Sequence, residues 1–248
     1  MGEVVTAWVV VPAHDEALRL PGTLAALAAQ TRRDFTLLVV DNASTDGTAD
    51  IARGFAATAP FPVVVLTEPE KGVGSAVDTG FRHAIAAGAD RIARTDADCL
   101  PRPGWFAAAM AALDEGAEMV CGRVVARRDE HGPLGRAVFS GLVAVAAVFG
   151  RWRPAHRHPR YRVPYRMHAG NDMAITADLY LRCGGMPRRP SPTDRAFLNA
   201  VREHSAAVVH RRDAVVENST RRLRAYGVLG TAAWYLDRGS AGRPVDPR

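Results

Sequence analysis

The feature that most constrains the fold of this chain is an alternation, in its first half, between short apolar runs and amphipathic stretches. The runs are rich in β-branched residues, and we predict strands at Ala7–Val11, Thr36–Val40, Val63–Thr67, Arg91–Thr95 and Met119–Val125. The stretches have helical periodicity, and we predict helices at Leu20–Gln30, Thr48–Thr58, Ser75–Ala87 and Pro103–Leu113. Strands that alternate with helices are typically parallel and joined by crossover helices. The first half therefore predicts an α/β sheet domain.

The second half has a weaker pattern. We predict a helix at Ala137–Phe149, buried or facing a partner, and then a loop or insertion rich in arginine, histidine and proline over residues 151–166. Further on we predict an extended segment at Asn171–Thr176, a short helix ending at Cys183, a helix at Asp194–Glu203, a strand at Ala207–His210 and a helix at Arg221–Leu236. Because no repeat or linker is visible, we expect a single domain over residues 1–248, with a regular half at 1–125 and a variable half at 126–248.

Composition excludes several classes of protein. With 48% apolar residues in 248 positions the chain can bury a full core, which excludes disorder. The longest apolar stretch, Ala137–Phe149, is too short to cross a bilayer, and the N-terminus has no export signal. Three scattered cysteines form neither a disulfide framework nor a ligand pair. We therefore expect a cytoplasmic protein.

The two halves differ in charge. The whole chain carries 32 Lys+Arg and 26 Asp+Glu, a net charge of +6. Residues 1–125 hold 10 basic and 16 acidic side chains, a net of −6, whereas residues 126–248 hold 22 and 10, a net of +12. Basic surfaces attract anionic partners, although a general preference for arginine in this Ala- and Arg-rich sequence explains the same count.

Polar residues cluster after each of the first four predicted strands. The clusters are Pro12–Glu16, Asp41–Thr48, Glu70–Gly74 and Asp96–Asp98. Ligands of open parallel sheets bind at the carboxyl ends of the strands, so we expect the four clusters to line one edge, which we call the rim. Part of the second cluster, Ser44 to Asp46, is equally well explained as a helix cap.

Asp96 and Asp98 are separated by one small residue, Ala97. Two carboxylates at this spacing supply the hard oxygen ligands that suit Mg²⁺ or Mn²⁺. The alternative is a solvated turn with a helix cap. The other clusters at the rim favour the metal, which there would stabilise a diphosphate leaving group.

This succession of segments resembles the nucleotide-sugar-binding half of family 2 glycosyltransferases of the GT-A fold. The segments that carry the resemblance are V-V-P-A-H-D-E at Val10–Glu16, V-V-D-N-A-S-T-D-G-T at Val39–Thr48, K-G-V-G at Lys71–Gly74 and D-A-D at Asp96–Asp98. The resemblance implies a Rossmann-like, mainly parallel central sheet flanked by helices, in which residues 1–125 bind the donor and the variable residues 126–248 face the acceptor. It also implies a nucleotide-diphosphate sugar as donor, most often a UDP-sugar, and Mn²⁺ or Mg²⁺ as cofactor.

Roles for single residues follow from the same resemblance. Glu16 would lie near the ribose, Asp41 would accept a hydrogen bond from the base, and Asp98 would be the more direct metal ligand. The donor-binding residues it implies are Pro12, Ala13, His14, Glu16, Asp41, Lys71, Gly72, Asp96, Ala97, Asp98 and Arg221. Arg221 belongs to Ser219-Thr220-Arg221-Arg222, which resembles a segment near the end of short bacterial members. The processive signature Gln-x-x-Arg-Trp is missing, so we expect a non-processive enzyme.

The second half resembles the family more loosely. A Gly-Asn segment at Gly170-Asn171, a Gly-Gly turn at Gly184-Gly185 and Thr193-Asp194 at a helix start follow the order of the family. The resemblance makes Asp194 the general base of an inverting transfer, with Thr193 in place of the usual Glu. A carboxylate at a helix start also serves as a simple cap. His210 resembles in placement a third metal ligand of some members, but a lone histidine is more often structural.

Other functions compete with this interpretation. A catalytically inactive relative that only binds nucleotide sugars fits the same motifs. A nucleic-acid-binding module is suggested by the arginines and tyrosines of residues 157–166, but no recognised motif accompanies them, so we expect no nucleic acid partner. We expect the arginines of the second half to bind one of three partners: the donor diphosphate, an anionic or lipid-linked acceptor, or a membrane surface. The sequence does not predict an oligomeric state.

Overall fold

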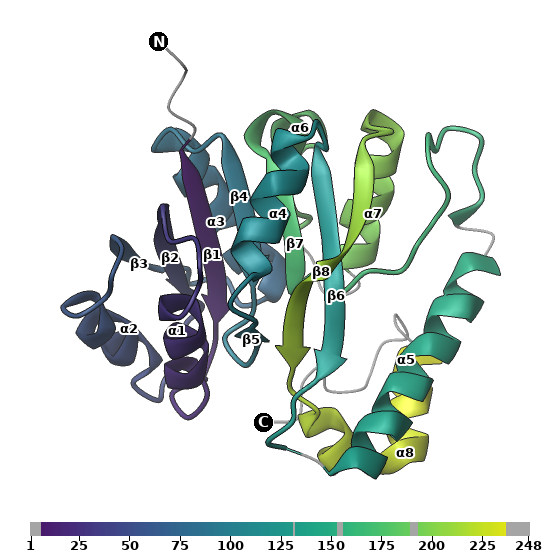
Figure 1. Ribbon diagram of the computed structural model, residues 1–248, viewed down its shortest axis with the longest axis horizontal. Helices are drawn as coiled ribbons and strands as arrows, with labels where there is room; N and C mark the ends of the chain where they lie inside the picture. The colour runs from purple at the N-terminus through teal and green to yellow at the C-terminus, as the bar shows by residue number, and fades with distance from the viewer. Residues whose placement is uncertain (1–5, 131, 153–155, 189–192, 237–248) are drawn as a thin grey trace.

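A computed structural model describes residues 6–130, 132–152, 156–188 and 193–236. Its centre is an eight-stranded sheet in the order β3-β2-β1-β4-β7-β6-β8-β5 (Figure 1). The strands are β1 (Ala7–Ala13), β2 (Phe35–Asp41), β3 (Val63–Thr67), β4 (Arg91–Thr95), β5 (Leu100–Pro101), β6 (Met119–Ala126), β7 (Asp172–Thr176) and β8 (Val208–Asn218).

The first four long strands form the parallel part of the sheet. β1 lies between β2 and β4, with Val10 opposite both Leu38 and Arg94, and β3 pairs with β2 at the edge. Three helices connect these strands: α1 (Leu20–Ala28), α2 (Thr48–Ala56) and α3 (Val73–Ala86). The parallel α/β arrangement predicted from the alternating pattern is confirmed.

The other half of the sheet is mixed. β7 lies antiparallel between β4 and β6, β8 runs parallel to β6, and the short β5 pairs antiparallel with β8. The helices of this half are α4 (Trp105–Asp114), α5 (Pro133–Trp152), α6 (Ala177–Arg182), α7 (Thr193–His204) and α8 (Arg221–Leu236). The whole is a mainly parallel sheet flanked by helices, as the sequence predicts.

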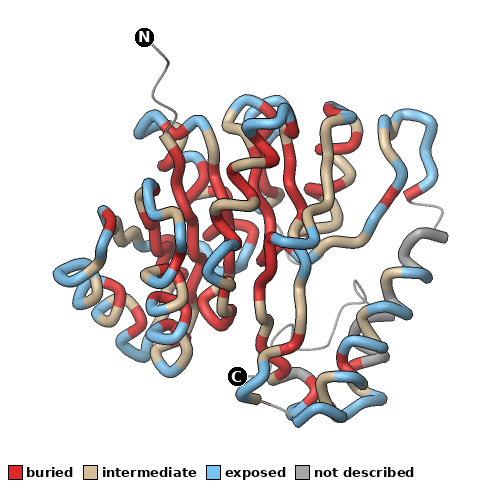
Figure 2. Tube along the Cα trace, in the orientation of Figure 1, coloured by how far each residue is buried: buried red, intermediate tan, exposed pale blue. Residues whose placement is uncertain are grey.

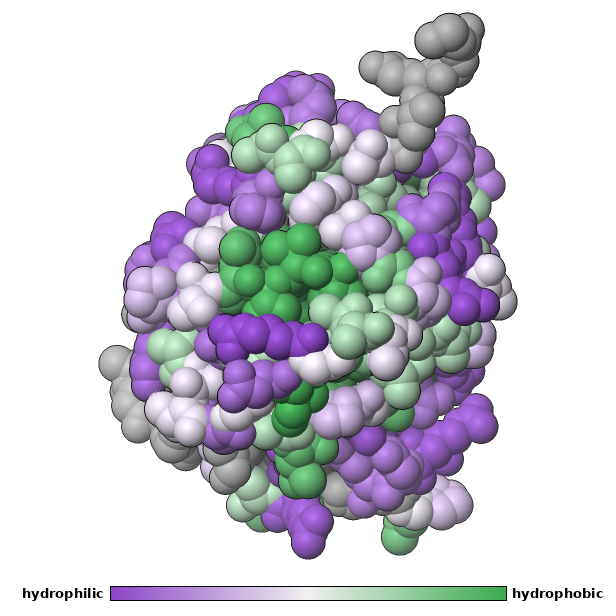
Figure 3. Space-filling model, turned by 90° about the vertical axis from the view of Figure 1, so that its left-hand side faces the viewer, coloured by the Kyte–Doolittle hydropathy of each residue, from purple (hydrophilic) through white to green (hydrophobic). Residues whose placement is uncertain are grey.

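Successive side chains along a strand point to opposite faces of the sheet, and each face packs into a separate hydrophobic core. Val9 and Val11 pack with α1, α2 and α4 on one face, whereas Trp8 and Val10 pack with α3, α6 and α7 on the other. Because both faces are covered, β1 is buried along its whole length and reads as a continuous apolar run (Figure 2). The edge strand β3 is only partly buried, and Figure 3 shows hydrophobic surface in the middle of this side of the molecule.

The structure differs from the sequence prediction at β8. We predicted that this strand ends at His210, but it continues to Asn218, and β5 beside it was not predicted. Arg211, Arg212 and Asp213 interrupt the apolar pattern because they lie in a bulge, where the register with β6 shifts between the pairs Cys121–His210 and Arg123–Val215. A bulge places consecutive polar residues in solvent without ending the strand.

Helices α5 and α8 pack against each other beside the end of β6 (Figure 1). Phe139 and Leu223 meet there in a small apolar cluster with Ala126. The predicted helix at Ala137–Phe149 is confirmed but is longer, and only part of it is covered, since Leu134 and Val148 remain exposed. In the described part of the chain no helix is long and apolar enough to span a bilayer.

Candidate active site

The first two rim clusters are hydrogen-bonded to each other. The amide of Asn42 donates to the carbonyl of Ala13 at 2.7 Å, which continues the pairing of β1 with β2. The amide of Glu16 donates to the hydroxyl of Thr48 at 2.9 Å, and the amide of Thr45 donates to the carboxylate of Asp15 at 2.7 Å. The polar residues after β1 and β2 therefore form one connected surface.

Asn42 joins the third cluster to this surface. Its side-chain amide donates to the carbonyls of Glu68 (2.9 Å) and Glu70 (2.7 Å), and its oxygen accepts from the amide of Gly72 (2.8 Å). Gly72 has a φ of 140°, a backbone conformation that residues other than glycine rarely adopt. Lys71 is held in the loop that these bonds fix, next to Gly72 at the start of α3.

Asp41 ends β2 and is 6% exposed. One of its carboxylate oxygens is buried without a hydrogen-bond partner among the described residues. A buried acceptor without a partner costs folding free energy unless a ligand supplies the donor. Asp41 is therefore a candidate ligand contact.

Arg188, from the second half of the chain, binds the loop between β3 and α3. Its guanidinium lies 2.9 Å from Glu68 and 2.8 Å from Glu70, and it donates to the hydroxyl of Thr79. Gly74, at the start of α3, leaves no room for a side chain, because an added Cβ would lie 2.2 Å from the carbonyl oxygen of Pro187. Pro187 and Arg188 thus pack against the loop before α3 and its first turn, a contact that the sequence pattern did not indicate.

Arg221 reaches the rim from the first turn of α8. Its Nη1 donates to Oε1 of Glu16 at 2.7 Å, and its Nη2 lies 3.4 Å from Oδ2 of Asp98. Burial raises the pKa of Glu16, and the charge of Arg221 opposes this rise. The structure therefore brings Glu16, Asp98 and Arg221 together, although Arg221 is 205 positions from Glu16.

Hydrogen bonds to its backbone carbonyls hold the loop that carries Asp96 and Asp98. The hydroxyl of Thr23 donates to the carbonyls of Ala97 and Cys99, both at 2.8 Å. Arg127 donates to the carbonyl of Asp98 at 3.1 Å. These bonds fix the backbone and leave the two carboxylates at the rim, with 30% exposure of the Asp96 side chain and 12% of the Asp98 side chain.

Arg94 is a functional candidate that the sequence analysis missed. It lies in β4, is 1% exposed, and contacts two carboxylates: its Nη2 is 3.0 Å from Asp96 and its Nη1 donates to Asp194 at 2.9 Å. Burial lowers the pKa of Arg94, but Asp96 and Asp194 more than offset this and raise it above the ordinary value. The signal in the sequence was an arginine inside the predicted strand Arg91–Thr95, two positions before Asp96.

Asp194 lies in the first turn of α7, above the Gly-Asn segment. A Cβ on Gly170 would lie 2.2 Å from its Oδ1, so glycine is required there by close approach. The next residue, Asn171, donates to the side-chain oxygen of Asn218 at 2.9 Å, and Asn218 also contacts the thiol of Cys99. The end of β8 therefore meets the Asp96–Asp98 loop through Asn218.

The structure does not bring His210 to this place. It pairs with Cys121 near the start of β8, eight positions before Asn218. Its pKa is lowered to about 4, chiefly by burial and also by the nearby charges of His168 and Arg166. Among the residues that the structure describes, no group of three His, Cys, Asp or Glu side chains is placed to hold a metal.

The two carboxylates nevertheless fit a divalent cation. The pKa of Asp96 is raised to about 6, chiefly because the carboxyl is partly buried and also because it faces Asp98 and Asp194, with Arg94 opposing. A further positive charge beside these carboxylates would be favourable. Mg²⁺ is commonly held by one or two carboxylates together with substrate phosphates, so two protein ligands suffice.

Comparison with known proteins agrees with this geometry. The family model of glycosyl transferase family 2 matches residues 8–189. An uncharacterized glycosyltransferase of Mycobacterium tuberculosis is 38% identical over 157 residues, 63% of this chain and 62% of that protein. A PGL/p-HBAD biosynthesis glycosyltransferase of Mycobacterium tuberculosis is 30% identical over 177 residues, 67% of each chain. The chain thus aligns with about two thirds of the length of these relatives.

Solved structures share the fold at low sequence identity. Residues 1–349 of Staphylococcus aureus TarS superpose with a TM-score of 0.65 and 16% identity, covering 95% of this chain and 67% of that one. The mannosyltransferase PcManGT from Pyrobaculum calidifontis, in complex with GDP-Man and Mn²⁺, gives 0.64 and 24%, covering 95% and 65%. Glucosyl-3-phosphoglycerate synthase from Mycobacterium tuberculosis, in complex with UDP, gives 0.57 and 19%, covering 96% and 83%. With its sheet, its rim and a family model that matches most of its length, this chain belongs to family 2 of the glycosyltransferases.

Proposed function

We propose that this protein transfers a sugar from a nucleotide-diphosphate sugar to an acceptor hydroxyl, with inversion at the anomeric carbon. The observation that carries the proposal is the double contact of Arg94, which holds Asp96 and Asp194 on either side of one guanidinium. The carboxylate pair suited to a metal and the carboxylate suited to a general base therefore share one rim. A donor bound at the first and an acceptor bound at the second would meet there.

The donor nucleoside is assigned to the surface formed after β1, β2 and β3. The buried oxygen of Asp41 suits the ring N–H of a base, and Glu16, held by Arg221, suits a ribose hydroxyl. We favour a UDP-sugar, because TarS and glucosyl-3-phosphoglycerate synthase are similar structures with bound UDP, although PcManGT binds GDP-Man.

The diphosphate is assigned to the space beside Asp96, Asp98 and Arg221. Asp98 and Asp96 would hold Mn²⁺ or Mg²⁺, which when bound would offset the negative charge of the departing diphosphate. Arg221 lies against Asp98 and brings a second positive charge to the same place. Mn²⁺ complexes of PcManGT and of glucosyl-3-phosphoglycerate synthase, both similar structures, support this cofactor.

Asp194 is assigned the role of general base. A hydroxyl is a weak nucleophile at neutral pH, so a positioned carboxylate must take its proton as it attacks. Arg94 keeps the carboxylate in place through their ion pair, and the side chain is 39% exposed, which leaves it open to an acceptor. Attack from the face opposite the leaving group then gives inversion in one step.

The test measures donor binding and donor consumption separately. Thermal shift with UDP and Mn²⁺ reports binding, and release of UDP from a panel of sugar nucleotides reports turnover. We expect Asp194→Asn to lose turnover and to keep the UDP shift, and Asp98→Asn to lose both. The exposed Asp213→Asn serves as control. A UDP shift without turnover of any donor by the unmodified protein would instead identify an inactive relative.

A further inference from the structure

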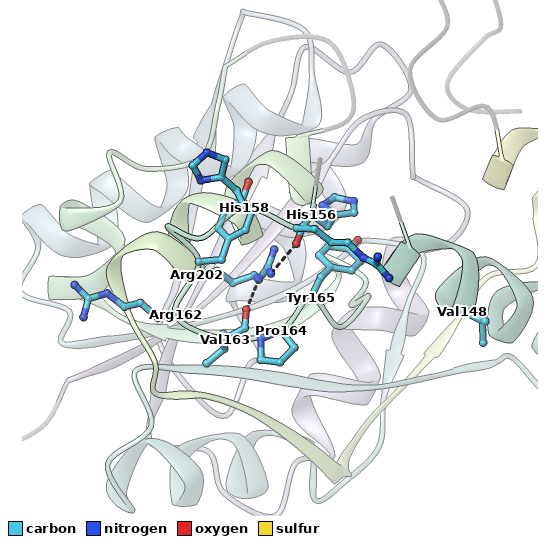
Figure 4. Close-up of a pocket in the computed structure, with 10 residues that line it drawn as sticks. Val148, His156, His158, Arg162, Val163, Pro164, Tyr165 and Arg202 are labelled. Carbon is cyan, nitrogen blue, oxygen red and sulfur yellow. Dashed lines mark hydrogen bonds between the residues drawn. The ribbon is translucent and has the colours of Figure 1, made fainter. Parts of the chain in front are cut away.

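A cavity of about 610 Å³ lies between α5, residues 156–165 and α7, and none of its described lining residues belongs to the rim (Figure 4). The described residues that line it are Val148, His156, Arg157, His158, Tyr161, Arg162, Val163, Pro164, Tyr165 and Arg202. Three are arginines and two are histidines, and none of the described lining residues is an Asp or a Glu. The lining is therefore suited to an anion, and the proposed transfer reaction has not used it.

The floor of the cavity is formed around the side chain of Arg202, which is 2% exposed. Its guanidinium donates to the carbonyls of Val163 (3.0 Å) and His156 (3.1 Å), the two bonds drawn in Figure 4. It also lies 4.1 Å from the ring centroid of Tyr161 and 5.4 Å from that of Tyr165. A buried cation between two aromatic rings fixes the course of residues 156–165.

The remaining arginines of the lining lie at the surface of the same segment. Arg157 and Arg162 are exposed, and Arg162 is oriented by a bond from its Nε to the carbonyl of Glu203 at 2.9 Å. Exposed guanidinium groups around a fixed floor bind phosphate through charge-assisted, often bidentate hydrogen bonds.

One wall of the cavity is apolar. Val148 of α5 lines it and is 54% exposed, and Val145, three positions earlier, is 53% exposed. Positions three apart lie on the same side of a helix, so the two valines continue an apolar strip away from the cavity. An exposed strip next to a cationic cavity suits a ligand that has a phosphate at one end and a hydrocarbon chain at the other.

Two parts of the chain connect this cavity to the proposed base. Arg202 is eight positions after Asp194 on α7, which is about 12 Å along the helix axis. Residues 165–170 run from Tyr165 in the cavity wall to Gly170 beneath Asp194. A ligand whose phosphate occupies the cavity could therefore carry a hydroxyl within reach of Asp194.

We propose that this cavity binds the phosphate of a lipid-linked acceptor, with the hydrocarbon chain along Val148 and Val145. The role of this lipid as an acceptor rests on the proposed transferase function, whereas the binding of a lipid phosphate does not. The binding test therefore does not depend on the transferase function.

The binding test uses dodecyl phosphate below its micelle concentration, with the full chain and titration calorimetry. Two variants change the cavity: Arg157→Gln with Arg162→Gln, and Val148→Asp. The control is Arg33→Gln with Arg53→Gln, two exposed arginines on the α1–α2 side of the molecule. We expect at least tenfold weaker binding in both cavity variants and no change in the control, with the UDP thermal shift the same in all. Inorganic phosphate should bind at least tenfold more weakly than dodecyl phosphate.

Three results would overturn the proposal. Equal binding by the cavity variants and the unmodified protein would place the ligand elsewhere. Equal loss in the control would mean that net charge alone attracts the ligand. Inorganic phosphate that binds as tightly as dodecyl phosphate would mean a free-phosphate site. If dodecyl phosphate binds as expected but no donor is consumed, the cavity stands as a lipid-phosphate site and the transferase function fails.

Discussion

Arg94 and Asp194 are one hundred positions apart in the chain and form a direct ion pair, with Nη1 of the arginine 2.9 Å from Oδ1 of the aspartate. Arg94 projects from β4 toward the face of the sheet that α7 covers, because its neighbour Ile92 packs on that face and residues two apart in a strand share a face. Asp194, in the first turn of α7, lies over the same face. The register of a strand and the position of a helix thus bring the proposed base to the proposed metal carboxylates.

Replacing Arg94 tests this relationship. In Arg94→Met the carboxylates of Asp96 and Asp194 would face each other without the cation between them. We therefore expect the free energy of unfolding to fall by about 3 kcal/mol. This is the lower end for a broken buried ion pair, because both carboxylates are partly exposed. Donor turnover should fall at least a hundredfold. Arg94→Lys should recover part of both, since it restores the charge but not the fork. Denaturant unfolding and UDP release measure the two effects, and an unchanged turnover in Arg94→Met would contradict the assignment.

Gly170 tests whether the position of Asp194 matters apart from its charge. Gly170→Ala places a methyl group where the carboxylate of Asp194 now lies, so the base must move. We expect the turnover of donor to fall at least tenfold while the UDP and Mn²⁺ thermal shift stays the same, because a base displaced by about 1 Å is a poor catalyst. Gly54→Ala is the matched control: nothing lies within 4 Å of its added Cβ, and it should stabilise α2 by up to about 1 kcal/mol.

Arg221 tests the donor side. Arg221→Gln removes the charge that holds Glu16 and lies beside Asp98, and it should raise the pKa of the buried Glu16 further. We expect UDP to bind about tenfold more weakly, the loss of one charge-assisted contact. Arg224→Gln, on the exposed side of the same helix, should bind UDP normally. Equal affinities of the two variants, measured by calorimetry, would remove Arg221 from the donor site.

His210 tests the composition of the metal site. Because His210 lies at the start of β8 and Asn218 meets the Asp96–Asp98 loop, His210→Gln should leave the Mn²⁺ dependence of UDP binding unchanged. Asp98→Asn should abolish that dependence. Loss of Mn²⁺ dependence in His210→Gln would restore the histidine as a ligand.

Asp172 should give the fold a pH dependence of its own. Its carboxyl is buried beneath the indole of Trp105, which donates to it at 2.8 Å, and burial raises its pKa from 3.8 to about 7. A raised carboxyl pKa means that the folded state holds the proton more tightly than the unfolded state. Its contribution to stability is therefore present at low pH and is lost as the pH rises toward 7, at up to roughly 1.4 kcal/mol per pH unit.

Comparison with Asp172→Asn isolates this effect. The stability of the unmodified protein relative to the variant should decline from pH 5 to pH 7 and level off above pH 8, measured by denaturant unfolding. The exposed Asp213→Asn should show no such decline, because Arg211 lowers the pKa of Asp213. A constant difference between the unmodified protein and Asp172→Asn from pH 5 to pH 8 would show that the carboxyl is not protonated in this range.

Local patterns in the sequence were sufficient for the first half of the fold. The predicted bounds of β3 and β4 agree with the structure at both ends, and the helices between the parallel strands are where periodicity predicts them. The clusters after β1, β2, β3 and β4 lie together because parallel strands end at one edge, a consequence of topology that residue order alone implies. Asp41, Asp96 and Asp98 could be proposed as site residues on this basis.

Contacts between distant parts of the chain could be decided only by the tertiary structure. Arg94 looks like an irregularity in a strand until α7 places Asp194 beside it, and Arg221 joins Glu16 only because α8 returns to the rim. The insertion of β7 between β4 and β6, and the exposed bulge that carries β8 on to Asn218, follow from strand pairing, which apolar periodicity does not encode. The sequence thus determined which local elements form and which chemistry they carry, and packing across long sequence separations determined which charges meet.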